Sequence, residues 1–463
     1  MNGDGVRDLR VAYIGGGSRG WAWGFMTDLA MDGQLCGVVR LYDIDREAAQ
    51  NNRVIGEKIS AHPDALSPWR YEVAQTLEEA LSGADFVVIS ILPGTFEEMR
   101  SDVHTPEKYG IYQSVGDTVG AGGIVRAMRT IPMYVEIAQA IRDHAPRAWV
   151  MNYTNPMSVC VRTLYRVFPG IKAFGCCHEV FGTQKLLAAM VRENLGVEDC
   201  ERQDIKTTVT GVNHFTWIQS ASYRQTDLFQ MYAAFADKYF ESGYLDARDD
   251  HGMNGYFACA HRVKFDLFRR YGLIAAAGDR HLAEFTPDTY LRSPECAQAW
   301  GFRLTPVSWR VEDLHRRLSR QRALLSGAEK PELKASGEEG HLLLKALLGL
   351  GDRISNVNLP NQGQIANLPL GAVVETNALF RRDEIRPVLA GPLPSAVHAL
   401  VARHCGNQEA TVEAALTQNR ALLEATFKND PQMAGLDADA ARRLLSEMLD
   451  NTRAYLPAWL REA

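Results

Sequence analysis

Several features that mark specialised classes of protein are missing from this sequence. No stretch approaches 18 uninterrupted apolar residues, and the first residues show no apolar signal segment. The eight cysteines include no CxxC pair and no zinc-finger spacing, which is typical of proteins in a reducing compartment. We therefore expect a cytoplasmic protein that does not associate with a membrane.

An excess of basic residues is also missing. The sequence has 50 Lys and Arg against 56 Asp and Glu, so its net charge is -6 and nucleic acid is not an expected partner. Hydrophobic residues make up 46% of the chain and charged residues 23%, which excludes a disordered or fibrous protein. Because 463 residues exceed the size of a single core, we expect two domains, at residues 1–200 and 201–463.

The first 190 or so residues alternate short β-branched runs with helical patterns, which predicts an α/β, doubly wound (Rossmann) sheet. The expected strands span residues 9–14, 38–42, 86–92 and 148–152, and the expected helices 21–30, 46–60 and 125–143. Helical patterns at 227–240, at 254–271 and in roughly the last 70 residues predict a mixed α+β second domain. The most charged stretch, 316–334, is most simply a solvated helix and loop without chemistry of its own.

A glycine-rich loop follows the first expected strand. Gly15, Gly17 and Gly20 occupy the three positions of G-x-G-x-x-G, with Ser18 between them, directly before a helix. Asp43 follows Gly20 by 23 residues, at the end of the second strand, where an acid binds a ribose diol and favours NAD over NADP. The alternative is an ordinary turn with a helix-capping aspartate, but the combination favours a dinucleotide site.

Further polar segments follow later strands, at the sheet edge where open α/β folds bind ligands. They span residues 116–123, 152–156, 175–178, 211–215 and 358–363. We expect Pro93 and Asn152 to lie beside the cofactor. Cys177 and His214 are a candidate ligand pair for a divalent metal, although a lone Cys is more often a core residue and a lone His a structural one.

In this order, these segments resemble glycoside hydrolase family 4, the NAD- and metal-dependent glycosidases whose fold is similar to that of lactate and malate dehydrogenases. The resemblance runs from Val11 to about Thr376. It includes the glycine loop, GDTVGAGG, the Asn-Pro pair, the Cys-His pair, the NHF segment and NLPNQGQIANLPLGAVVE. It is nearest to the α-galactosidase/α-glucosidase and α-uronidase branches.

The resemblance implies roles for individual residues. Cys177 is similar to the metal-binding cysteine of the family, because it directly precedes His178, and His214 is similar to the metal-binding histidine. Asn155 resembles the residue that binds substrate hydroxyls, and Asp117 the acid at the reacting sugar. The metal that the family implies is Mn²⁺ or another divalent ion.

The mechanism that the resemblance implies is oxidation and elimination, an exception to the usual displacement by two carboxylates. A hydride leaves C3 for NAD, a base removes the C2 proton, the aglycone leaves C1, water adds, and C3 is reduced again. Two residues are candidates for the base, Asp279 and Tyr256, with a slight preference for Asp279. The alternative for Asp279 is a turn or helix cap, and for Tyr256 an aromatic on a packed helix.

For the substrate, a guanidinium and an imidazole at Arg280 and His281 suit an acidic group at C6 of the sugar, and Asn213 is a further expected contact. We therefore expect an α-galacturonide or α-glucuronide. The alternatives are a neutral α-galactosidase or α-glucosidase, a sulfoquinovosidase, a 6-phospho-glycosidase, an NAD-dependent hydroxy-acid or sugar dehydrogenase, and a non-catalytic NAD-binding regulator. By analogy with the family, we expect a homodimer or homotetramer.

Overall fold

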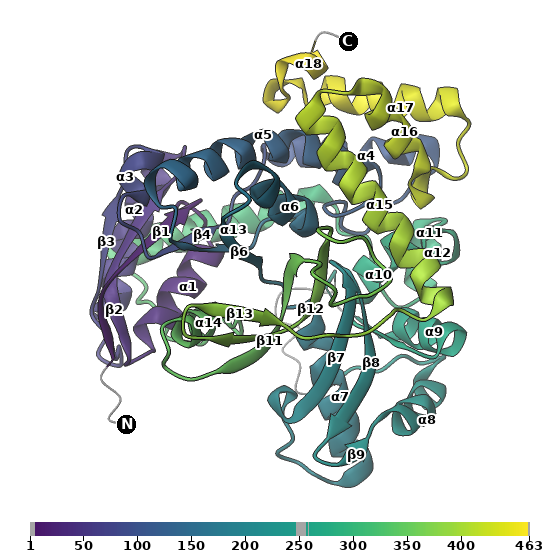
Figure 1. The fold of residues 1–463 in the computed structure, drawn as a ribbon, viewed down its shortest axis with the longest axis horizontal. Coiled ribbons are helices and arrows are strands. Elements are labelled where there is room, and N and C mark those ends of the chain that lie inside the picture. The colour runs from purple at the N-terminus through teal and green to yellow at the C-terminus, as the bar shows by residue number, and fades with distance from the viewer. Residues whose placement is uncertain (1–4, 247–255, 258, 462–463) are drawn as a thin grey trace.

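The computed structural model describes residues 5–246, 256–257 and 259–461, and a nine-stranded sheet runs through one half of it (Figure 1). The sheet order is β13-β12-β11-β6-β5-β4-β1-β2-β3. The six neighbouring strands β1 to β6 are parallel, whereas β11 to β13 pair antiparallel. The strands are β1 (Val6–Ile14), β2 (Leu35–Tyr42), β3 (Trp69–Val73), β4 (Phe86–Ile89), β5 (Trp149–Asn152), β6 (Lys172–Gly175), β11 (Arg353–Pro360), β12 (Val373–Arg381) and β13 (Glu384–Pro387).

The predicted Rossmann arrangement is confirmed, and its first two helices occupy the predicted residues. β4 ends at Ile89, earlier than predicted, and α5 begins at Gly120, earlier than predicted. A Cβ at Gly123 would lie 2.5 Å from the carbonyl carbon of Thr118, so this glycine lets the first turn of α5 pack against its own loop. The helices of this half are α1 (Trp21–Ala30), α2 (Arg46–Ser60), α3 (Leu77–Leu81), α4 (Phe96–His104), α5 (Gly120–His144) and α6 (Met157–Val167).

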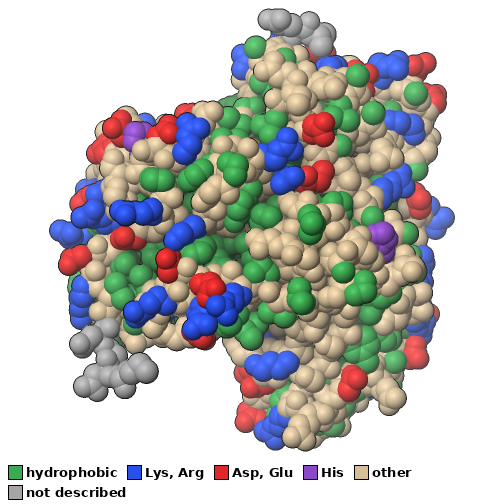
Figure 2. Space-filling view, viewed as in Figure 1, with side chains coloured by type: hydrophobic (Ala, Val, Ile, Leu, Met, Phe, Trp, Pro, Cys, Tyr) green, Lys and Arg blue, Asp and Glu red, His purple; other side chains and the backbone are tan. Residues whose placement is uncertain are grey.

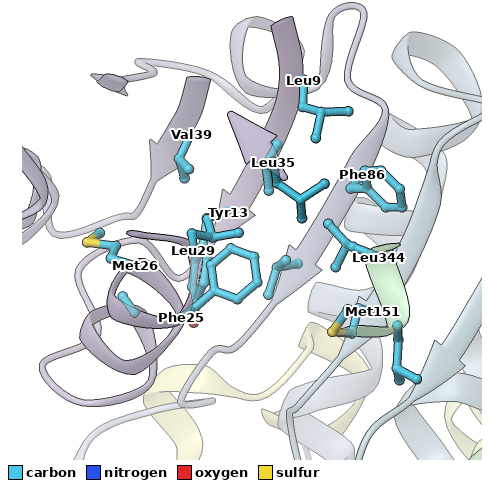
Figure 3. Close-up of a cluster of buried hydrophobic side chains, with 14 of the residues drawn as sticks. Leu9, Tyr13, Phe25, Met26, Leu29, Leu35, Val39, Phe86, Met151 and Leu344 are labelled. Atoms are coloured by element: carbon cyan, nitrogen blue, oxygen red, sulfur yellow. The ribbon is translucent and has the colours of Figure 1, made fainter. Parts of the chain in front are cut away.

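One face of the sheet is covered by segments that are far apart in the sequence. Figure 3 shows Phe25, Met26 and Leu29 of α1 in the same buried cluster as Leu344 of α14 (Gly340–Leu347). The cluster is apolar and buried, so the late segment contributes to the same core as the glycine-loop helix. The sheet and its core thus take elements from both sides of residue 200, and the division into two domains at that residue stays a prediction.

The other half is built on a smaller sheet, β10-β8-β7, with β9 paired to β8. The predicted helix at 227–240 is confirmed as α8, but α9 begins at Arg262, later than predicted, and residues 254, 255 and 258 lie outside the described residues. The elements are β7 (Ile205–Val212), β8 (Phe215–Tyr223), β9 (Thr226–Asp227), β10 (Ile274–Ala275), α7 (Glu179–Leu195), α8 (Phe229–Tyr239), α9 (Arg262–Tyr271), α10 (Asp279–Phe285), α11 (Pro287–Tyr290), α12 (Pro294–Ala299) and α13 (Val307–Ser326).

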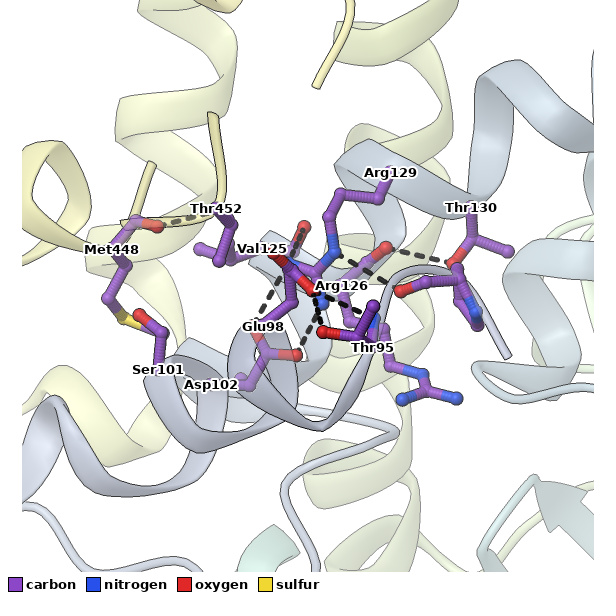
Figure 4. A network of polar contacts seen from close by, with 12 residues as sticks. Thr95, Glu98, Ser101, Asp102, Val125, Arg126, Arg129, Thr130, Met448 and Thr452 are labelled. Carbon is purple, nitrogen blue, oxygen red and sulfur yellow. Dashed lines mark hydrogen bonds and ion pairs between the residues drawn. The ribbon is translucent and has the colours of Figure 1, made fainter. Parts of the chain in front are cut away.

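The predicted C-terminal helices pack on the sheet half beside α4 and α5 (Figure 1). They are α15 (Ser395–Thr417), α16 (Arg420–Asn429), α17 (Ala438–Asn451) and α18 (Ala458–Arg461). Beneath them, Arg129 of α5 forms a fully buried ion pair with Asp102 of α4, at 2.5 Å (Figure 4). This pair ties the two helices together, and Arg129 Nε also donates to the Pro93 carbonyl after β4.

The surface agrees with the composition. Acidic and basic side chains are interspersed over the face seen in Figure 2. Among the described residues, no helix combines the length and the apolar character needed to cross a membrane.

Candidate active site

A cavity of about 570 Å³ lies at the carboxyl edge of the large sheet, where this edge meets the second half of the chain. Its lining combines residues at the ends of β1, β5 and β6 with residues of α10, α13 and the turn between β7 and β8. Its lining includes Tyr13, Gly20, Trp21, Asp117, Tyr153, Asn155, Cys176, Cys177, His178, Glu179, His214, Phe257, Cys259, Asp279, Arg280, His281, Arg310 and Arg317. Many of the predicted site residues therefore share one cavity.

Three of these residues form a group of metal-ligand type. One ligand atom each from Asp117, His214 and His281 lies within 4.8 Å of the others, and the two imidazoles stack with ring centroids 4.0 Å apart. The Thr118 hydroxyl donates to Asp117 Oδ1 at 2.7 Å and lies 2.9 Å from His214 Nδ1. Because the Thr118 hydroxyl gives its proton to the bond with Asp117, it can only accept in its contact with His214. The proton of His214 is therefore on Nδ1, and Nε2 keeps a lone pair. This is the tautomer that a metal ligand needs.

The ionisation of the group also suits a cation. Burial, together with the neighbouring His281, lowers the pKa of His214 to about 3, so this imidazole is neutral. Burial alone would raise the pKa of Asp117, but His281, His214 and the Arg126 guanidinium outweigh it and hold this pKa well below its usual range. The site thus offers a carboxylate and a neutral imidazole side by side.

The predicted pair of Cys177 and His214 shares this cavity, but the compact group joins His214 to Asp117 and His281. Cys177 is buried, and its carbonyl accepts a hydrogen bond from Asn356 at 3.3 Å. His281, which we expected to contact substrate, thus belongs to the group of metal-ligand type. The role of Cys177 as a ligand stays a prediction.

Asn155 lies beside Asp117, and the roles of both residues at the sugar stay predictions. Its Nδ2 donates to Asp117 Oδ2 at 3.1 Å, and its backbone carbonyl accepts from Arg126 Nε at 3.1 Å. Its buried Oδ1 has no partner within the described chain, so this residue of the cavity lining keeps an unsatisfied acceptor. Asn213 is fully buried and donates to Glu375 at 3.0 Å, and it is not among the residues that line the cavity.

The two candidates for the base have different surroundings. The carboxylate of Asp279 accepts from the backbone amides of Val263 at 3.2 Å and Lys264 at 3.3 Å, in the first turn of α9. Burial raises the pKa of Asp279 to about 7. The ring of Tyr256 lies 6.3 Å from that of Trp309. The contacts of Asp279 are those of a helix cap, the alternative that the sequence left open, and the identity of the base stays a prediction.

Two guanidinium groups face the same cavity. Arg280 lies 4.5 Å over the Phe257 ring and donates to the Ser114 carbonyl at 3.1 Å, while its buried Nε has no partner in the described residues. Arg310, on α13, makes no hydrogen bond or ion pair with any described residue. Burial and then the charge of Arg310 lower the pKa of Arg280 to about 10. Two neighbouring cations with unused donors form a site for an anion.

Sequence reasoning found Arg280 but missed Arg310. The two residues are 30 positions apart, and the sequence between them gives no local signal that both side chains face one cavity.

The glycine loop has the geometry of a nucleotide cradle. Gly15 has φ of +93°, and a Cβ there would lie 1.9 Å from the carbonyl oxygen of Ser90, so only glycine fits. The amide of Gly17 donates to Asp43 Oδ2 at 2.8 Å, and the amide of Ser18 closes the turn onto Gly15 at 3.0 Å. Asp43 thus stands against the loop at the end of β2, where we expected it.

Pro93 and Asn152, which we expected beside the cofactor, are not among the residues that line the cavity. The carbonyl of Pro93 accepts from Arg129 Nε at 3.3 Å. Asn152 is fully buried, and its amide group bonds the backbone of Thr154 at 3.0 and 3.1 Å. Asn152 therefore holds the turn that carries Asn155.

Comparison with known proteins agrees with this geometry. The model described as family 4 glycosyl hydrolase matches residues 10–193, and that of the family's C-terminal domain matches residues 209–433. The chain is 58% identical over 455 residues to an alpha-galacturonidase of Thermoanaerobacterium saccharolyticum, with 98% of each chain covered.

Two solved structures have the same fold over nearly the whole chain. A crystal structure of a Bacillus subtilis protein described as a glucosidase superposes with a TM-score of 0.91 at 53% identity, covering 96% of this chain and 100% of that one. A 6-phospho-alpha-glucosidase from gut microorganisms, in complex with NAD and Mn²⁺, gives a TM-score of 0.79 at 20% identity, covering 97% and 99%. The family matches span most of the sequence, and the chain belongs to the family 4 glycosyl hydrolases.

Proposed function

We propose that this enzyme hydrolyses the α-glycosidic bond of galacturonides. The observation that carries the proposal is the pair Arg280 and Arg310, which face one cavity. Among the described residues, Arg280 Nε has no partner and Arg310 makes no hydrogen bond or ion pair. A carboxylate at C6 of the sugar satisfies both groups, whereas the neutral hydroxymethyl group of a galactoside does not. The high identity to an alpha-galacturonidase supports the same choice.

We propose NAD and a divalent metal, Mn²⁺ or a similar ion, as the cofactors. The glycine loop fits a dinucleotide, because Gly15 allows the tight turn beside the Ser90 carbonyl and Asp43 stands at the end of β2, where an acid binds a ribose diol. The carboxylate and neutral imidazole at Asp117 and His214 fit a divalent cation, with His281 and the predicted Cys177 as further ligands. When bound, the dinucleotide supplies a reversible hydride acceptor and the metal a Lewis acid.

The remaining residues orient the sugar and move protons. Arg280 and Arg310 bind the C6 carboxylate and so fix the ring in one orientation. Asn155 Oδ1 accepts a hydrogen bond from a ring hydroxyl, and the ionised Asp117 beside it accepts a hydrogen bond from a second hydroxyl. The proton at C2 is removed by Asp279 or Tyr256, the two residues predicted from the sequence.

Kinetics with two substrates tests the proposal. The substrates are 4-nitrophenyl α-D-galacturonide and the matching α-D-galactoside, each with NAD and Mn²⁺ under reducing conditions. Arg280→Met and Arg310→Met should each lower kcat/KM for the galacturonide by about tenfold to a hundredfold, the value of a charge-assisted hydrogen bond. The kcat/KM for the galactoside should be nearly unaffected by either substitution. The control is Arg316→Met, which replaces an exposed arginine on the same helix as Arg310 and should change kcat/KM for neither substrate. Equal losses on both substrates would contradict the proposal.

The same proposal includes a homodimer or homotetramer in the cytoplasm, by analogy with the family. Light scattering of the purified protein tests the oligomer, and a monomer at micromolar concentration would contradict it.

A further inference from the structure

The helix α13 returns to the glycine loop from almost 300 residues further along the chain. Nη1 of Arg317 donates to the carbonyl of Arg19, within the loop, at 3.1 Å. A Cβ on Gly20 would lie 2.1 Å from the same Nη1, so the missing side chain at Gly20 makes room for this guanidinium. The third glycine of the motif thus leaves space for the contact of Arg317 with the loop, which the sequence did not predict.

This contact places a cation at the start of α1. Gly20 is the N-cap of α1, the first amides of this helix receive no side-chain cap from the described residues, and Gly20, Trp21 and Arg317 all line the cavity. Unpaired amides at a helix N-terminus attract anions, and phosphate is the anion that a glycine loop of this kind binds. Arg317 adds a positive charge at that position, and its Nη2 makes no hydrogen bond to a described residue.

Arg317 is held in place by its neighbours. Its Nε donates to Asp313 Oδ2 at 2.6 Å, and the other oxygen of Asp313 pairs with Arg316 at 3.2 Å. One carboxylate between two guanidiniums leaves a net positive charge on this turn of α13. Gln321, one turn further along, accepts from Arg19 Nε at 3.3 Å.

The end of α13 is anchored as well. Lys58 of α2 donates to the carbonyls of Leu324 and Leu325 at 2.6 and 2.8 Å. Because α2 belongs to the nucleotide-binding half, these bonds fix the register of α13 over the glycine loop. The guanidinium therefore needs little rearrangement to meet a ligand.

We propose that Arg317 is a phosphate-binding residue of the dinucleotide site. The proposal rests on the proposed function, in that it takes NAD as the ligand of the glycine loop. Hydrolysis leaves the oxidation state of the sugar unchanged, so any hydride taken up must be returned before the dinucleotide leaves. A side chain that ties α13 to the bound phosphates would slow that departure.

Binding measurements, without turnover, test this role. Isothermal titration of NAD, ADP and adenosine is carried out on the full-length wild type, Arg317→Met, Arg317→Lys and the control Arg316→Met. We expect Arg317→Met to raise the Kd of NAD and ADP by about tenfold or more and to leave adenosine unchanged. Arg317→Lys keeps the charge, so its Kd for NAD and ADP should lie between those of Arg317→Met and the wild type. The Kd values of Arg316→Met should equal those of the wild type.

The opposing results are distinct. Equal Kd values for NAD in Arg317→Met and Arg316→Met would overturn the role of Arg317. An equal loss for adenosine would overturn it too, since the side chain would then act by shaping the loop. A wild type that binds none of the three ligands would contradict the proposed function itself.

Discussion

Glu284 is a buried carboxyl group whose ionisation should cost stability. It is fully buried on α10, and its Oε1 accepts from the amides of Val115 at 2.7 Å and Gly116 at 2.9 Å. Its Oε2 has no partner in the described part of the chain. Burial, with a smaller contribution from the charge of Asp117, raises the pKa of Glu284 from 4.5 to about 7.

The sign of the effect follows from proton binding. Between pH 4.5 and about 7 the folded protein holds a proton on Glu284 that the unfolded chain has lost, so stability falls as the pH rises through this window. The difference between the two pKa values corresponds to about 3 kcal/mol of unfolding free energy. Below pH 4.5 the full contribution is present, and above pH 7 it is lost.

The substitution Glu284→Gln should remove this pH dependence. The amide keeps an oxygen for the two backbone donors and carries no charge. In urea unfolding between pH 4.5 and 8, the free energy of unfolding of the variant should rise relative to that of the wild type as the pH rises, by up to about 3 kcal/mol. Glu78→Gln, at an exposed position on α3, is the control and should follow the wild type. Parallel pH profiles for Glu284→Gln and the wild type would refute the reasoning.

Two further predictions concern the buried ion pair and the metal. Arg129→Met should lower the free energy of unfolding by about 3–5 kcal/mol, because it leaves Asp102 buried without its partner, and the double variant with Asp102→Leu should lose less. Urea unfolding measures both, and a double variant less stable than Arg129→Met would contradict the account. If His281 and Cys177 are ligands, His281→Ala and Cys177→Ser should each weaken Mn²⁺ binding about tenfold or more in calorimetric titration. The control Cys176→Ser should change the affinity for Mn²⁺ only slightly. A larger loss of Mn²⁺ affinity in Cys176→Ser than in Cys177→Ser would show that Cys176, and not Cys177, is the ligand.

Local signals in the sequence predicted the nucleotide-binding half well. The glycine loop, α1 and α2 are set by turn chemistry and by helical periodicity within a few residues, and the structure has these helices at the predicted positions. The ordered polar segments likewise predicted that Asp117, Asn155 and His214 share one site. Such features can be predicted from the sequence because they are determined by residues that are close together along the chain.

Contacts between distant segments could not be predicted in this way. Three features depend on how distant segments of the chain pack: the return of α13 to the glycine loop, the placement of Arg280 and Arg310 at one cavity, and the grouping of His281 with His214. The charged stretch at 316–334 illustrates the limit. Its composition predicts a solvated helix, yet Arg317 within it lies on the cofactor loop.

The most direct test of the account compares one substrate with its neutralised form. Hydrolysis of 4-nitrophenyl α-D-galacturonide is measured beside that of its methyl ester, with NAD and Mn²⁺ present. The ester keeps the shape at C6 but removes the charge that Arg280 and Arg310 would bind, so the free acid should be cleaved about tenfold faster or more. Equal rates for acid and ester, or NADH accumulation without release of nitrophenol, would contradict the assignment of an α-galacturonidase.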